Sequence, residues 1–206
     1  MSRLWIKVCG LGTREAVEAA VEAGADAVGF VFHPASPRHL TLDQARALAV
    51  HVPAGVARVA VFLRPAPEVV ADVVRGLAPD LVQVDADAVE GLGLPAGQAV
   101  LPVVRDGESP ARWPERLLYE GARSGTGERA DWSRAAGIAR HASLVLAGGL
   151  DASNVGDAVR AVRPSGVDVS SGVERTRGLK DPLMIRQFVE AARAAERRLA
   201  AEEQRR

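Results

Sequence analysis

The stretch LWIKVCGLGTREAVEAAVEAGADAVGFVF, residues 4–32, contains a complete strand–helix–strand pattern. Residues 4–9 and 26–32 are short apolar runs of strand length, and residues 13–23 carry apolar and charged side chains at helical spacing. Because a parallel pair of strands needs a long crossover connection, two apolar strands joined by a helix predict a parallel sheet covered by helices.

The same alternation continues through the chain. The apolar runs that predict strands are residues 4–9, 26–32, 56–63, 80–84, 99–104, 116–120, 143–147 and 166–170. The amphipathic segments that predict helices include residues 13–23, 42–51, 67–77, 152–162 and 181 to about 202. This regular alternation predicts an α/β fold, a single (βα)8 TIM barrel domain over residues 1–206. An open doubly wound sheet is the alternative.

Two connections lack a full helix in this prediction. Residues 85–97 leave room only for a short helix, and residues 106–114 contain one glycine and two prolines and are expected to form a loop. Some barrel helices are therefore expected to be shortened or replaced by loops.

Composition excludes several classes of protein. The 206 residues include 26 basic and 26 acidic side chains, so the zero formal charge predicts no nucleic-acid or membrane partner. No apolar run approaches the roughly 20 residues of a membrane span. The N-terminus shows no signal peptide, and the single cysteine fits a reducing cytoplasm better than a disulfide-stapled secreted protein.

The only cysteine, Cys9, closes the first apolar run. Barrel enzymes keep their chemistry at the carboxyl ends of the strands, which favours a functional thiol. Lys7 is two residues earlier, so its side chain should leave the strand on the same face, where an ammonium favours the thiolate. The alternative is a small buried hydrophobe, the usual fate of a free cysteine.

Three further charged residues lie at predicted strand ends or in a loop after a strand. Asp168 interrupts an apolar run, and a buried carboxylate needs either structural partners or a chemical task. Glu120 closes its run in the same way. Arg38 follows the second run and is either a solvated loop arginine or a bidentate clamp for a carboxylate or phosphate.

Small residues follow the last two predicted strands. Gly148 and Gly149 follow the seventh run, and Ser170, Ser171 and Gly172 follow the eighth. Glycines let backbone N–H groups approach an anion, and barrels often bind phosphate between these two loops, so we predict a phosphate site. The alternative is that the glycines only form tight turns. The four histidines show no metal-ligand spacing, so no metal is expected.

Taken together, these motifs resemble the phosphoribosylanthranilate isomerase family of tryptophan biosynthesis. The resemblance covers residues 6 to about 189 and rests on KVCG (7–10), GADAVGFVF (24–32), SPR (36–38), VF (61–62), LAGGL (146–150), VDVSSGVE (167–174) and GLKD (178–181). It implies a barrel enzyme without a cofactor, acting on a small phosphorylated substrate in the cytoplasm as a monomer or homodimer.

The resemblance implies an Amadori rearrangement of N-(5-phosphoribosyl)anthranilate to 1-(2-carboxyphenylamino)-1-deoxyribulose 5-phosphate. A general acid protonates the furanose ring oxygen, and a general base removes the proton from the sugar C2. By motif match Cys9 is the base, its thiol pKa modestly lowered, and Glu120 is the acid. Asp168 is an auxiliary carboxylate, Arg38 holds the anthranilate carboxylate, and Lys7 also belongs to the substrate-binding set.

Two positions depart from the family pattern. The family closes its sixth strand with an aspartate where this chain has Glu120, which reaches about one methylene farther. Asp85 occupies a histidine position at the fourth strand end, where it is expected to contact substrate and to place negative charge beside it. These departures keep two alternatives open: a non-catalytic sugar-phosphate-binding barrel, or an aminoaldose–ketose isomerase with another substrate.

Overall fold

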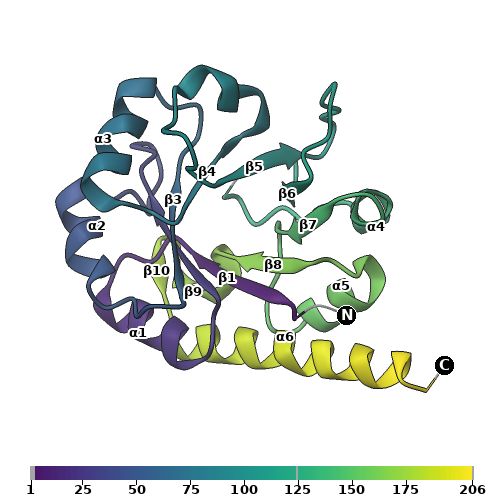
Figure 1. The fold of residues 1–206 in the computed structure, drawn as a ribbon. Helices are drawn as coiled ribbons and strands as arrows, with labels where there is room; N and C mark the ends of the chain where they lie inside the picture. Colours follow the sequence, from purple (N-terminus) through teal and green to yellow (C-terminus); the bar gives the residue numbers. More distant parts are fainter. Residues whose placement is uncertain (1–2, 124, 206) are drawn as a thin grey trace.

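Eight parallel strands form a closed barrel in the computed structural model of the protein, which describes residues 3–123 and 125–205 (Figure 1). The strands are β1 (Trp5–Cys9), β2 (Ala27–Val31), β3 (Ala57–Val61), β4 (Leu81–Asp85), β5 (Val100–Arg105), β6 (Arg116–Glu120), β7 (Ser143–Leu146) and β8 (Gly166–Val169). They pair in chain order, and β8 pairs with β1 to close the barrel. The predicted (βα)8 barrel is confirmed, and the open-sheet alternative is wrong.

Helices surround the barrel on its outer face (Figure 1). They are α1 (Arg14–Glu22), α2 (Leu42–Ala49), α3 (Pro67–Leu77), α4 (Trp132–Ala139), α5 (Val155–Val162) and α6 (Pro182–Glu203). A 3-10 helix, η1 (Ala86–Leu92), joins β4 to β5, and the β5–β6 connection contains no helix among its residues, as the sequence predicted. No helix in the described ranges has the length and apolar character needed to cross a membrane.

Three local features differ from the sequence prediction. Helix α5 begins at Val155 rather than at residue 152, because the Asp151 carboxylate accepts the backbone N–H groups of Ser153 and Asn154 in a turn. Helix α4 was not predicted. After β8 the chain forms a short 3-10 turn, η2 (Ser171–Val173), and an unpredicted hairpin of β9 (Glu174–Thr176) and β10 (Leu179–Lys180).

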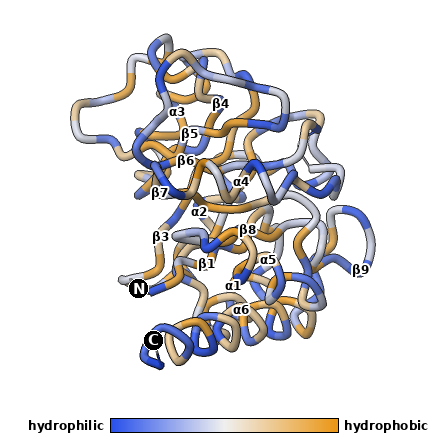
Figure 2. The backbone as a smooth tube through the Cα atoms, turned by 90° about the vertical axis from the view of Figure 1, so that its right-hand side faces the viewer, coloured by the Kyte–Doolittle hydropathy of each residue, from blue (hydrophilic) through white to orange (hydrophobic). Residues whose placement is uncertain are grey.

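Apolar side chains pack on both faces of the barrel wall, which explains the near-continuous apolar runs. The interior cluster consists of Ala27, Val59, Leu81, Leu101, Val103, Leu118, Val145 and Ala147. A larger cluster packs the outer face of the strands against the helices, and Figure 2 shows the hydrophobic strands and the mixed character of α6. Because the interior is filled, any binding site must lie at an end of the barrel.

Candidate active site

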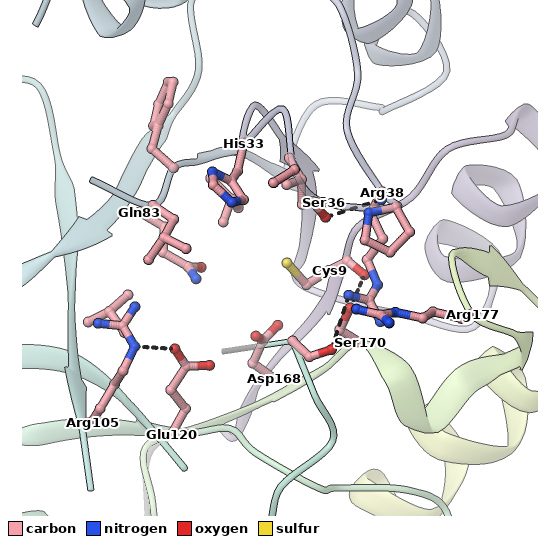
Figure 3. A pocket seen from close by; sticks show the side chains of 18 residues that line it. Cys9, His33, Ser36, Arg38, Gln83, Arg105, Glu120, Asp168, Ser170 and Arg177 are labelled. Atoms are coloured by element: carbon pink, nitrogen blue, oxygen red, sulfur yellow. Dashed lines mark hydrogen bonds and ion pairs between the residues drawn. The ribbon is translucent and has the colours of Figure 1, made fainter. Parts of the chain in front are cut away.

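A cavity opens at the carboxyl ends of the strands, where the sequence predicted the chemistry (Figure 3). Its polar wall includes five of the predicted residues: Cys9, Arg38, Glu120, Asp168 and Ser170. Its apolar wall includes Val31, Val61, Phe62, Leu63 and Val103. The site therefore combines a hydrophobic surface with a few converging polar groups, which is typical of a small-molecule site.

Cys9 lies above a buried ion pair. Lys7 is paired in register with Asp168 across β1 and β8, and its Nζ donates to Asp168 Oδ1 at 2.8 Å. Lys7 is 0% exposed and does not line the cavity, so its predicted direct contact with substrate is not supported. Lys7 is enclosed within the barrel, where its charge favours the ionised form of the Cys9 thiol.

Burial raises the pKa of the Cys9 thiol, and the nearby Lys7 ammonium offsets only part of this effect. The expected lowering of the cysteine pKa is therefore wrong. Burial also opposes the charge of Lys7, yet Asp168 and Cys9 together raise the lysine pKa above its ordinary value. Lys7 thus remains an ammonium that can stabilise a thiolate once Cys9 loses its proton.

Arg38 reaches the cavity but is held by a carboxylate that sequence analysis missed. Its Nε and Nη2 donate to Glu174 Oε1 and Oε2 at 2.6 and 3.0 Å, and both side chains are buried. Lys180 Nζ also donates to Glu174 Oε1, at 2.6 Å, and to the Ser170 carbonyl at 2.9 Å. The fork of Arg38 is therefore engaged within the protein, and its Nη1 edge lies toward the Gly125 carbonyl at 3.4 Å.

This buried cluster gives a pH-dependent contribution to stability. Burial alone would raise the pKa of Glu174, but the hydrogen bonds from Arg38 and Lys180 lower it from 4.5 to about 2. A carboxyl whose pKa is lower in the folded than in the unfolded state stabilises the fold above its unfolded pKa. That contribution is fully present above about pH 4.5 and disappears as the pH falls toward about 2.

We expect Glu174→Gln to lower the free energy of unfolding at pH 7 by roughly 2 to 3 kcal/mol, because two buried cations lose their shared anion. The difference in the free energy of unfolding between variant and wild type should decrease as the pH falls from 4.5 toward 2, because wild-type Glu174 becomes protonated in this range. Urea unfolding at several pH values measures this. The matched control is Glu22→Gln, which removes an exposed pair with Arg186 and should cost at most about 1 kcal/mol.

Asp85 is also placed differently from its prediction as a substrate-binding residue. It is 1% exposed and does not line the cavity. Its carboxylate accepts the Arg64 backbone N–H at 2.8 Å and Arg105 Nη1 at 2.5 Å. The negative charge expected beside the substrate is thus neutralised by Arg105, and it is the arginine that faces the cavity.

Gln83 is a cavity residue that sequence analysis did not single out as functional. It is 7% exposed, and among the described residues its Oε1 has no hydrogen-bond partner. Figure 3 shows its amide directed into the cavity between His33 and Arg105. A buried carbonyl oxygen without a donor is costly, so this atom is suited to accept a hydrogen bond from a ligand. The available signal was a polar residue inside an apolar strand.

A second, adjoining pocket is lined by the glycine-rich segments. Gly148, Gly149, Ser170 and Ser171 line it, together with the loop after β6. Gly148 and Gly149 adopt φ values of 85° and 63°, and a Cβ on either would lie within 3.0 Å of backbone atoms of that loop. Only glycine allows this close approach. Glu120 lines both this pocket and the main cavity, so the two adjoin at this side chain.

Gly172, which was predicted to bind phosphate, does not line this second pocket, but it allows the loops after β7 and β8 to approach closely. A Cβ on Gly172 would lie 2.0 Å from the carbonyl oxygen of Leu150. We expect Gly172→Ala to separate the loops after β7 and β8 and to weaken inorganic phosphate binding by about tenfold or more. Gly156→Ala, in α5 with nothing within 4 Å of its Cβ, should leave phosphate affinity unchanged. Equal affinities in the two variants would contradict this reading.

Comparison with known proteins gives one consistent result. Residues 6–191 match the family model described as N-(5'phosphoribosyl)anthranilate (PRA) isomerase. The chain is 40% identical to the N-(5'-phosphoribosyl)anthranilate isomerase of Rhodopseudomonas palustris (strain HaA2), over 93% of this chain and 96% of that protein.

Solved structures agree with the sequence comparison. The phosphoribosyl anthranilate isomerase from Thermotoga maritima superposes with a TM-score of 0.81 at 32% identity, covering 93% of this chain and 100% of that one. A phosphoribosyl anthranilate isomerase in complex with reduced 1-(o-carboxyphenylamino)-1-deoxyribulose 5-phosphate gives a TM-score of 0.77 at 32% identity and the same coverage.

Proposed function

The chain belongs to the N-(5'-phosphoribosyl)anthranilate isomerase family, and from that premise we propose how its cavity performs the reaction. The reaction, a step of tryptophan biosynthesis, converts N-(5'-phosphoribosyl)anthranilate into 1-(2-carboxyphenylamino)-1-deoxyribulose 5-phosphate. One observation carries the proposal: Cys9 of β1 and Glu120 of β6 point into the same cavity from different strands (Figure 3). The two roles of an acid–base isomerisation can thus be assigned to two groups that face one substrate.

Glu120 is the proposed general acid. It lies at the junction of the main cavity and the pocket lined by Gly148, Gly149 and Ser171. A phosphate bound among the backbone N–H groups of that pocket would place the attached ribose beside Glu120. Glu120 then donates a proton to the ring oxygen as the bond between this oxygen and C1 breaks. The nitrogen lone pair forms the C1=N bond of an iminium.

Cys9 is the proposed general base. Its thiolate takes the proton from C2, and the electron pair of that C–H bond forms a C1–C2 double bond while the iminium nitrogen becomes neutral. The resulting enolamine gains a proton at C1 and loses one from the C2 hydroxyl, which gives the ketone. The Lys7 ammonium, fixed by Asp168, stabilises the negative charge on sulfur in the active form.

The remaining cavity residues fit the anthranilate group. Phe62, Leu63 and Val103 offer an apolar surface for the benzene ring. The Nη1 edge of Arg38 is the proposed contact for the carboxylate, because Glu174 already engages the rest of the guanidinium. The unpartnered Gln83 Oε1 is suited to accept a hydrogen bond from a substrate hydroxyl or N–H group.

One turnover experiment tests this proposal and separates it from the alternatives. Freshly generated phosphoribosylanthranilate is added to the purified protein, and the loss of its anthranilate fluorescence is followed. Turnover that is lost when the substrate lacks its anthranilate carboxylate supports the proposed isomerase activity. A folded protein that binds reduced carboxyphenylamino-deoxyribulose phosphate without turnover would favour the non-catalytic barrel. Equal turnover of a substrate lacking the carboxylate would favour an isomerase of another aminoaldose.

Residues 1–206 are proposed to act as one catalytic domain, because every proposed site residue belongs to the same barrel. The mechanism needs only one chain, so a monomer and a homodimer would both support it. A cysteine base must stay reduced, which supports the cytoplasm as its compartment.

A further inference from the structure

Three charged side chains form a continuous row across the ends of neighbouring strands, and two of them, Arg105 and Glu120, line the cavity. Asp85 ends β4, Arg105 ends β5 and Glu120 ends β6. Arg105 and Glu120 are direct register partners, and Arg105 Nε lies 3.2 Å from Glu120 Oε1. Arg105 Nη1 lies 2.5 Å from Asp85 Oδ1. One guanidinium therefore bridges two carboxylates, and Figure 3 shows its contact with Glu120.

The far end of this row is anchored away from the cavity. Each Asp85 oxygen accepts a hydrogen bond, Oδ1 from Arg105 and Oδ2 from the backbone N–H of Arg64. Arg64 adopts a φ of 43°, in the left-handed region that residues other than glycine rarely occupy. The loop after β3 thus presents its N–H group to Asp85 in a specific conformation, and Asp85 is fixed from two sides.

All three side chains are largely buried. The side chains of Asp85, Arg105 and Glu120 are 2%, 11% and 16% exposed. The carboxylates of Asp85 and Glu120, with a further contribution from Glu108, raise the pKa of Arg105 even though burial opposes its charge. Buried ion pairs with good geometry are weak evidence for net stability, but they do hold groups in one orientation. The row is therefore better suited to orienting a side chain than to stabilising the fold.

We propose that Arg105 and Asp85 are positioning residues for Glu120: Arg105 binds Oε1 of the Glu120 carboxyl group, the proton that Glu120 donates is carried by the other oxygen, and Asp85 fixes Arg105 from behind. This inference rests on the proposed role of Glu120 as general acid. A glutamate side chain has one more rotatable bond than an aspartate side chain. Catalytic rate falls when the carboxyl group of a general acid is misplaced by about 1 Å. The bridge to Arg105 removes that freedom. Asp85 supplies the counter-charge that keeps Arg105 in place, without itself touching the substrate.

The first test is Asp85→Asn, which keeps the shape of the side chain but removes its charge. We expect kcat to fall by about ten- to one hundredfold, with the dissociation constant for reduced carboxyphenylamino-deoxyribulose phosphate changed less than about threefold. The matched control is Asp80→Asn on the opposite end of the barrel. Asp80 likewise accepts a backbone N–H, that of Arg58, and pairs with its guanidinium. Its substitution should leave kcat unchanged.

The second test places the same change in a Glu120→Gln protein. If Asp85 acts only through Glu120, then Asp85→Asn lowers the residual turnover no further, because contacting residues in one network are not additive. Arg105→Met should behave like Asp85→Asn in both backgrounds, and Arg105→Lys should recover part of the lost kcat. Thermal unfolding and binding of the reduced product analogue verify that each variant is folded.

The outcomes separate this inference from the function on which it rests. Full turnover by Glu120→Gln would contradict the role of Glu120 as the acid. Loss of turnover in Glu120→Gln together with normal kcat in Asp85→Asn and Arg105→Met would overturn only the positioning role. An equal further loss from Asp85→Asn in the Glu120→Gln background would also overturn it, because Asp85 would then act by another route.

Discussion

Replacing Cys9 by alanine is expected to lower kcat for phosphoribosylanthranilate by about a thousandfold, within the 10²- to 10⁴-fold range of general acid–base catalysis. The thiol faces the cavity, is the only cysteine, and lies beside an ammonium that is itself held by Asp168. Removing Sγ leaves the apolar wall and the phosphate pocket in place. The affinity for the reduced product analogue should therefore change little, and the loss should appear in kcat.

Cys9→Ser is the matched control for size and polarity. A serine hydroxyl is a far weaker acid than a thiol, so this variant should be about as inactive as the alanine variant. Turnover by Cys9→Ser near the wild-type rate would contradict a thiolate base. The raised thiol pKa adds a pH prediction: alkylation of Cys9 in the ligand-free protein should accelerate with rising pH beyond the range of an ordinary cysteine.

Glu120→Gln is expected to produce the other large effect, a fall in kcat of about a hundredfold or more. The amide keeps the length of the side chain and can still contact Arg105, but it cannot donate a proton to the sugar ring oxygen. Substrate binding should be nearly intact because the pocket lined by Gly148 and Gly149 is unchanged. Steady-state kinetics with freshly generated substrate measures this effect.

Glu120→Asp provides the matched control because it keeps the carboxyl group on a side chain that is one methylene shorter. We expect a smaller loss of kcat than in Glu120→Gln, since the carboxyl remains but loses its 3.2 Å contact with Arg105. If Glu120→Gln retained normal turnover, the acid would have to be assigned to another group. A Glu120→Asp protein as inactive as Glu120→Gln would show that position matters as much as acidity.

Local sequence patterns were sufficient to predict the barrel. Each strand is an apolar run of barrel-strand length, and most long connections carry helical periodicity, so the order of the strands followed from the chain itself, although helix α4 was missed. The hairpin of β9 and β10 was missed because its hydrogen bonds join two very short segments whose pairing depends on the buried contacts of Glu174 and Lys180. Such tertiary contacts leave no periodic pattern in a single sequence.

The same distinction between local pattern and tertiary contact explains which site residues were placed correctly from the sequence. Position at a strand end placed Cys9 and Glu120 at the cavity, because every strand of a barrel ends on the same face. Lys7 and Asp85 were assigned to the substrate but are covered by other side chains. Whether a residue at a strand end reaches the cavity depends on its neighbours on adjacent strands. Arg105 covers Asp85 in this way, and no local pattern indicates that pair.

The most direct test of the account is a crystal structure of the protein with reduced carboxyphenylamino-deoxyribulose phosphate bound, and the distance to measure joins Cys9 Sγ to the sugar C2. We expect these atoms within about 3.5 Å, the separation of groups poised to react. The phosphate should lie against Gly149 and Ser171, with the Glu120 carboxyl beside the oxygen released from the ring. A C2 atom that faces Asp168 or Arg105 instead, out of reach of the thiol, would contradict the assignment of Cys9 as the base.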